Sequence, residues 1–98
     1  MMNRTQWFLA KLAEEAAEVS QRAMKAQQFG MEEVQPEQHL NNLERLVLEA
    51  HDFIATYQLM LSEIDAGIEV MPGAGKIEQR RQKMEKFLGL SQSLNQVA

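Results

Sequence analysis

The sequence predicts an all-α fold, an antiparallel bundle of three main helices in one domain that spans residues 1–98. Apolar residues recur at steps of three and four along three long stretches, which is the spacing of one helix face. Gly and Pro, which interrupt helices, gather in two short segments between these stretches. The strict apolar–polar alternation of a half-buried strand does not occur.

The first predicted helix covers residues 5–29, a stretch without Gly or Pro. Thr5 is the expected N-cap and Gly30 the expected C-cap, because these residue types commonly end helices at those positions. The apolar row of this helix, which we expect to form its packing seam, consists of Leu9, Leu12, Ala16, Val19, Ala23 and Ala26.

A connection follows over residues 30–38, either fully irregular or with a short helical turn at 31–34. Pro36 is expected near the first turn of the second helix, where its missing N–H does no harm. We expect the second helix to end at Gly67. Its apolar row consists of Leu40, Leu43, Val47, Ala50, Ile54, Tyr57, Leu61 and Ile64.

Residues 67–75 contain three Gly and one Pro and predict a second connection. From Lys76 the residues favour a helix, with Ile77, Met84 and Leu88 on one face and a break at Gly89. The tail at 90–98 either adds a short fourth helix or frays.

Composition narrows the classes of function and location. The net charge of −4 argues against broad electrostatic binding to nucleic acid or to an anionic membrane. There is no cysteine for a disulfide or a thiolate zinc site, no apolar run of about 20 residues and no secretory signal. We therefore expect a cytoplasmic protein.

The small size of the chain predicts an oligomer. A domain of this length buries only roughly 60 to 65 % of the surface that its unfolded chain exposes. Helices of a short chain often complete their core against a second copy, so a homodimer or a homotetramer is expected.

Two pairs of carboxylates are the main candidates for a site. Glu15 and Glu18 on the first helix, and Glu49 and Asp52 on the second, are each three residues apart and so share a helix face. An antiparallel arrangement can bring the two pairs level, where their charges repel unless a cation lies between them. A hard divalent ion that prefers oxygen ligands fits such a cluster.

The alternative interpretation is that these carboxylates are solvated charges on amphipathic helices. Two leucines beside the second pair, in the row Leu48, Ala55, Leu59, favour a covered face over a solvated one. Trp7 also lies away from the expected seam, so it needs a partner, either another helix or a ligand base.

The motif Glu-Glu-x-x-Glu at 14–18, followed by Glu-x-x-Asp at 49–52, resembles the signature of the MazG-like all-α NTP pyrophosphohydrolases. The sequence around it, at 11–26, 42–46 and 83–88, is similar to that of the short phage and integron-type members. The resemblance covers residues 5–90. The chain departs from the pattern in its longer stretch between the two motifs and in Phe53.

The resemblance implies a nucleotide-pool house-cleaning enzyme that hydrolyses a nucleoside triphosphate to the monophosphate and pyrophosphate. It implies Mg²⁺, or Mn²⁺ in its place, held by Glu15, Glu18, Glu49 and Asp52. Glu15 is our candidate for the residue that accepts a proton from the attacking water, with Glu14 in a supporting role.

Basic side chains are expected to contact the triphosphate. Lys76, Arg80 and Lys83 share one face of the third helix, and Arg22 and Lys25 extend the face of the first carboxylate pair. A solvated face neutralised by Glu78 and Glu85 is the alternative.

Two other classes of function remain open, a non-catalytic helical module that binds a partner protein and a nucleotide sensor with little turnover. A phosphate-binding loop at 73–76 is rejected, because Val70 and Ile77 stand where that motif requires Gly and Ser or Thr.

Overall fold

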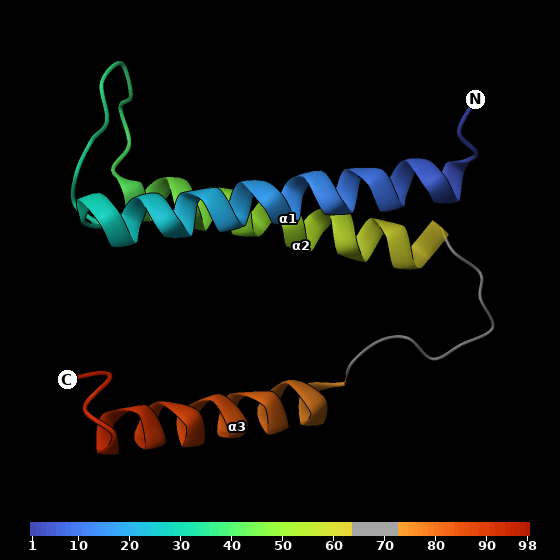
Figure 1. Cartoon of the computed structure of the whole chain (residues 1–98). Coiled ribbons are helices and arrows are strands. Elements are labelled where there is room, and N and C mark those ends of the chain that lie inside the picture. Colours follow the sequence, from blue (N-terminus) through green and yellow to red (C-terminus); the bar gives the residue numbers. More distant parts are fainter. Residues whose placement is uncertain (64–72) are drawn as a thin grey trace. The chain divides into compact units, whose positions relative to one another are not determined.

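The computed structural model describes residues 1–63 and 73–98. These residues form three helices, α1 (Arg4–Phe29), α2 (Asn42–Glu63) and α3 (Ala74–Ser93), and no strand (Figure 1). The all-α prediction is therefore confirmed. The chain divides into two compact units, Met1–Gly67 and Ile68–Ala98, and each is described by itself. Within the described ranges, no helix is long and apolar enough to cross a membrane.

Helix α1 begins with a capping box built on Asn3, so the prediction of Thr5 as the N-cap is wrong. The Gln6 backbone N–H donates to Asn3 Oδ1 at 2.8 Å, and the Asn3 N–H donates to Gln6 Oε1 at 3.0 Å. This reciprocal pair satisfies two backbone donors at the helix start, which one threonine hydroxyl could not do. The predicted C-cap is confirmed: Gly30 has a φ of 94°, and its N–H donates to the Ala26 carbonyl at 2.9 Å.

Helix α2 begins at Asn42, six residues after Pro36, so the prediction that places Pro36 near its first turn is wrong. Pro36 lies in a separate turn, and Glu37 beside it has a φ of 66°, which a helix cannot contain. Asn41 and Glu44 repeat the reciprocal pairing seen in α1, with N–H to side-chain distances of 2.8 and 3.1 Å.

The connection between α1 and α2 contains turns and no helix, so the irregular alternative for residues 31–34 holds. Asn42 ties this connection to the helices, because it is only 1 % exposed and its Nδ2 donates to the Gly30 carbonyl at 2.8 Å. The predicted end of the second helix, at Ile64 to Gly67, lies outside the described residues.

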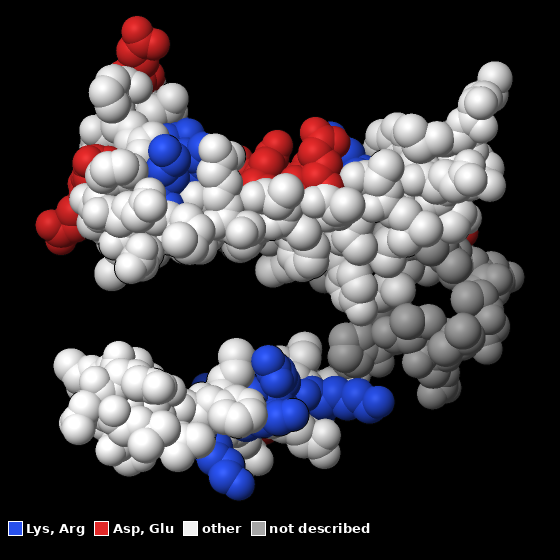
Figure 2. Space-filling model, in the orientation of Figure 1, with Lys and Arg blue, Asp and Glu red and all other residues white. Residues whose placement is uncertain are grey.

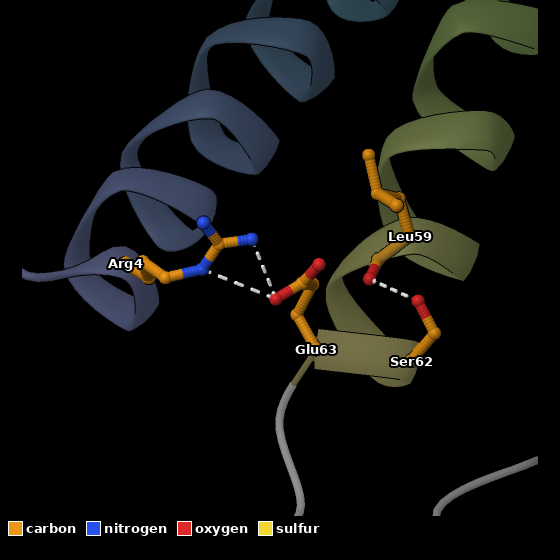
Figure 3. A network of polar contacts seen from close by, with 4 residues as sticks. All are labelled: Arg4, Leu59, Ser62 and Glu63. Carbon is orange, nitrogen blue, oxygen red and sulfur yellow. Dashed lines mark hydrogen bonds and ion pairs between the residues drawn. The ribbon is translucent and has the colours of Figure 1, made fainter.

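Helices α1 and α2 run antiparallel and side by side as a hairpin (Figure 1). At the open end of the hairpin, Arg4 Nη2 lies 2.7 Å from Glu63 Oε2 (Figure 3). Buried and half-buried residues recur at steps of three and four along both helices and form the packing seam. They include Phe8, Leu12, Glu15, Val19, Arg22 and Ala26 on α1, and Asn42, Leu46, Ala50, Phe53, Tyr57 and Met60 on α2.

The seam differs from the predicted one, which is therefore partly wrong. Leu9 on α1, and Leu43, Val47 and Ile54 on α2, were expected inside and are exposed. Both helices carry apolar side chains on more than one face, and the face that packs also contains Glu15 and other polar residues. A prediction from apolar periodicity alone ignores polar residues that lie in the seam. It therefore selects a row of residues on a different side of the helix from the side that packs.

Helix α3 begins at Ala74, two residues before the predicted start, with Gly73 at its N-cap. The predicted break at Gly89 is wrong, because the helix continues through Gly89 to Ser93. A single Gly costs only about 1 kcal/mol in a helix, which the flanking residues offset. The tail ends in a turn at Leu94 and Asn95 and adds no fourth helix. Most of the predicted connection at 67–75 lies outside the described residues.

Candidate metal centre

Three of the predicted carboxylates meet near the middle of the hairpin. Glu15 and Glu18 come from α1 and Glu49 from α2, and one carboxylate oxygen of each lies within 4.8 Å of the other two. Figure 2 shows acidic side chains at mid-length of the hairpin with basic side chains on both sides of them. Because Glu15 belongs to the row that packs against α2, the antiparallel register itself brings the two helices' carboxylates together.

Two oxygen atoms of this cluster are enclosed without a partner. Glu15 is only 9 % exposed, and neither its Oε2 nor the Oε2 of Glu49 has a hydrogen-bond partner among the described residues. Burying an ionised oxygen without compensation is costly, so natural proteins usually pair such a group or place it on a cation. The donor set consists of carboxylate oxygens alone, which suits a hard cation.

The charges of the cluster raise the pKa of Glu49 above its ordinary value. The largest cause is the hydrogen-bonding interaction with the nearby Glu18 carboxyl, which favours the protonated form of Glu49. Partial burial follows, and then the negative charges of Glu18, Asp52 and Glu15. Glu49 therefore holds its proton more strongly than an isolated carboxyl group would.

Lys11 is the cation that contacts this cluster among the described residues, and the sequence analysis missed it. Its Nζ lies 3.8 Å from Glu15 Oε1 and 3.6 Å from Glu14 Oε2. Its position four residues before Glu15 is the signal that could have identified it. One lysine whose side chain is 39 % exposed neutralises three carboxylates only in part.

Asp52 and Glu14 were predicted for the site and lie at its edge. Asp52 is exposed and outside the group of three, although its charge contributes to the raised pKa of Glu49. Glu14 is exposed and pairs with Lys11. The structure thus separates the four predicted ligands into three that converge and one beside them.

The predicted substrate-binding residues of α1 lie on both sides of the carboxylates. Arg22 is half-buried in the seam, and Lys25 places its Nζ 5.5 Å from the centre of the Phe29 ring. Trp7 is 52 % exposed, and its ring meets the ring of Phe8 edge-on at 5.1 Å.

The other predicted basic residues, Lys76, Arg80 and Lys83, lie exposed on α3, in the second unit. Of the two acidic residues expected to neutralise this helix, Glu78 pairs with Arg81 at 3.2 Å. The contact of these lysines and this arginine with a substrate stays a prediction.

Compared with models of protein families, with curated proteins and with solved structures, the chain has no match.

Proposed function

We propose that this protein is a Mg²⁺-dependent nucleoside triphosphate pyrophosphohydrolase of the MazG-like kind, which converts an NTP or dNTP to the monophosphate and pyrophosphate. The observation that carries the proposal is the convergence of Glu15, Glu18 and Glu49, with enclosed oxygens that have no hydrogen-bond partner in the described part of the chain. The motif resemblance at 14–18 and 49–52 connects this cluster with nucleotide hydrolysis.

In this proposal Glu15, Glu18 and Glu49 hold the ion, and Asp52 completes the ligand set from the next turn of α2. Mg²⁺, or Mn²⁺ with the same oxygen ligands, would supply positive charge that offsets the phosphate oxygens and makes nearby water more acidic. The antiparallel hairpin contributes rigidity, because ligands from two packed helices are held in place before the ion binds.

Glu15 is the proposed proton acceptor for the attacking water. Its two oxygens have different surroundings, since Oε1 faces Lys11 and Oε2 has no partner among the described residues. An oxygen without a donor can accept a hydrogen bond from water and then its proton. Glu14 shares Lys11 with Glu15 and so influences the charge around the acceptor.

The test is a screen for pyrophosphate release over standard and modified NTPs and dNTPs, with and without Mg²⁺. Glu15→Gln and Asp52→Asn should each lower turnover at least about 100-fold if they bear on the chemistry. Glu78→Gln, which removes the same charge on α3, is the matched control and should leave turnover unchanged. Glu14→Gln reports whether Glu14 supports the reaction.

The outcomes separate the classes of function. Binding of nucleotide and Mg²⁺ without turnover would identify a nucleotide sensor and overturn the enzyme proposal. If neither ligand binds, the enzyme and the sensor both fail, and a helical module that binds a partner protein remains. If Glu15→Gln turned over the nucleotide as fast as the wild type does, the roles proposed for the cluster would be overturned.

A further inference from the structure

Arg22 carries a positive charge that the described residues do not neutralise. The residue is half-buried in the hairpin seam, and its Nη1 is enclosed without a hydrogen-bond acceptor in residues 1–63 and 73–98. A guanidinium has five N–H donors and does not lose its proton in proteins. The enclosed nitrogen therefore still needs a hydrogen-bond acceptor. In the same way, the enclosed oxygens of the carboxylate cluster still need a cation.

The expected partner of Arg22 is engaged elsewhere. Glu18 precedes Arg22 by four residues, the spacing at which ion pairs form along a helix. Ion pairs among the described residues join other groups, and one Glu18 carboxylate oxygen lies within 4.8 Å of an oxygen of Glu15 and of Glu49. The site thus keeps its carboxylates and its guanidinium apart, one helical turn from each other.

Lys25 extends this positive end of the site. It lies three residues after Arg22 on neighbouring faces of α1, and its Nζ contacts the Phe29 ring rather than a described carboxylate. An aromatic ring holds an ammonium group in position without cancelling its charge. Two cations therefore lie between the carboxylate cluster and the connection of residues 30–41.

We infer that Arg22, with Lys25 beside it, binds a phosphate oxyanion of a polyphosphate ligand whose other phosphate oxygens lie on the ion at the carboxylates. The planar guanidinium suits this ligand class because it can donate two parallel hydrogen bonds to one phosphate. The inference rests on the proposed function for the cation site. It also gives the orientation of the bound ligand, because the polyphosphate chain runs from Glu15 and Glu18 toward the 30–41 connection.

The experiment uses the full chain and two calorimetric titrations, Mg²⁺ alone and then inorganic pyrophosphate at saturating Mg²⁺. In Arg22→Gln we expect Mg²⁺ affinity within about threefold of wild type and pyrophosphate affinity at least about tenfold lower. If the Gln variant fails to fold, Arg22→Met takes its place, because it keeps the apolar stem in the seam. The same result is expected of it. Arg81→Gln removes an exposed arginine of α3 as the matched control and should bind both ligands normally.

Each outcome has one meaning. A folded Arg22 variant that binds pyrophosphate as tightly as wild type overturns the inference and leaves the cation site standing. Loss of Mg²⁺ and pyrophosphate binding together in the variants assigns Arg22 a structural role and also overturns it. A wild-type chain that binds no Mg²⁺ overturns the proposed function itself.

Discussion

Glu15 occupies a position of α1 that packs against α2, where an apolar residue would be more stable in the absence of a ligand. It is among the most buried residues of the described chain, and it lies beside two further carboxylates. A buried carboxylate beside like charges is costly without a cation, so this residue lowers the stability of the metal-free hairpin. Such a loss of stability at one position is typical of residues selected for binding rather than for packing.

Glu15→Gln should therefore stabilise the metal-free protein. We expect a gain of about 1 kcal/mol, which in a domain of this size is a rise in Tm of about 4–8 °C. Thermal unfolding followed by circular dichroism measures it. Excess Mg²⁺ should raise the Tm of the wild type and not that of the variant. A matched loss of stability in Glu15→Gln and Glu14→Gln would contradict this account.

The raised pKa of Glu49 predicts how metal-free stability depends on pH. Since its folded-state pKa lies above the unfolded value, the folded state binds the proton more tightly. Its contribution to stability is thus present below the unfolded pKa and is lost as the pH rises through the folded pKa. Urea unfolding at a series of pH values should show this fall in the wild type, and Glu49→Gln should remove it. A difference between the two proteins that does not change with pH would refute the prediction.

At the scale of the elements, both helices of the hairpin begin with the same device. Asn3 with Gln6, and Asn41 with Glu44, exchange reciprocal hydrogen bonds between side chain and backbone. The pattern Asn-x-x-Gln or Asn-x-x-Glu is readable in the sequence, and it would have located both starts. These boxes set where each helix begins.

Replacement of the cap residues tests this explanation. Asn3→Ala and Asn41→Ala should each destabilise the protein by about 1 kcal/mol, because each leaves a helix-terminal N–H without its acceptor. Thr5→Ala is the matched control inside the first turn and should change the free energy of unfolding by less than about 0.5 kcal/mol. A larger loss from Thr5→Ala than from Asn3→Ala would restore Thr5 as the cap.

At the scale of the whole molecule, the hairpin buries few apolar side chains. Phe8, Ala26 and Met60 are its buried apolar residues among those described. Meanwhile three residues of the row predicted as the seam of α2, Leu40, Leu43 and Val47, are exposed. They line a groove of about 370 Å³ together with Glu44, Leu48 and His51. A hairpin with so small a core needs further apolar cover, which supports the expectation of a homodimer or homotetramer.

Self-association is accordingly the prediction at this scale. Analytical ultracentrifugation of the wild type should give the mass of two or four chains. The double change Val47→Glu and Ile54→Glu should shift it to the monomer, because it places charges on the exposed apolar row. Gln58→Glu adds charge at another exposed position of α2 and serves as the control. A wild-type chain that sediments as a strict monomer would contradict the prediction.

The sequence by itself determined the number of helices, the C-cap at Gly30 and the two i, i+3 carboxylate pairs. These features depend on hydrogen bonds and side-chain spacings within about one helical turn, which adjacent residues specify. Only the tertiary structure decided which face of each helix packs, and therefore that Glu15 is enclosed, that Asp52 stays exposed and that Arg22 Nη1 has no hydrogen-bond partner among the described residues. The rotation of a helix about its axis follows from packing against side chains distant in sequence, and apolar residues on several faces allow more than one choice.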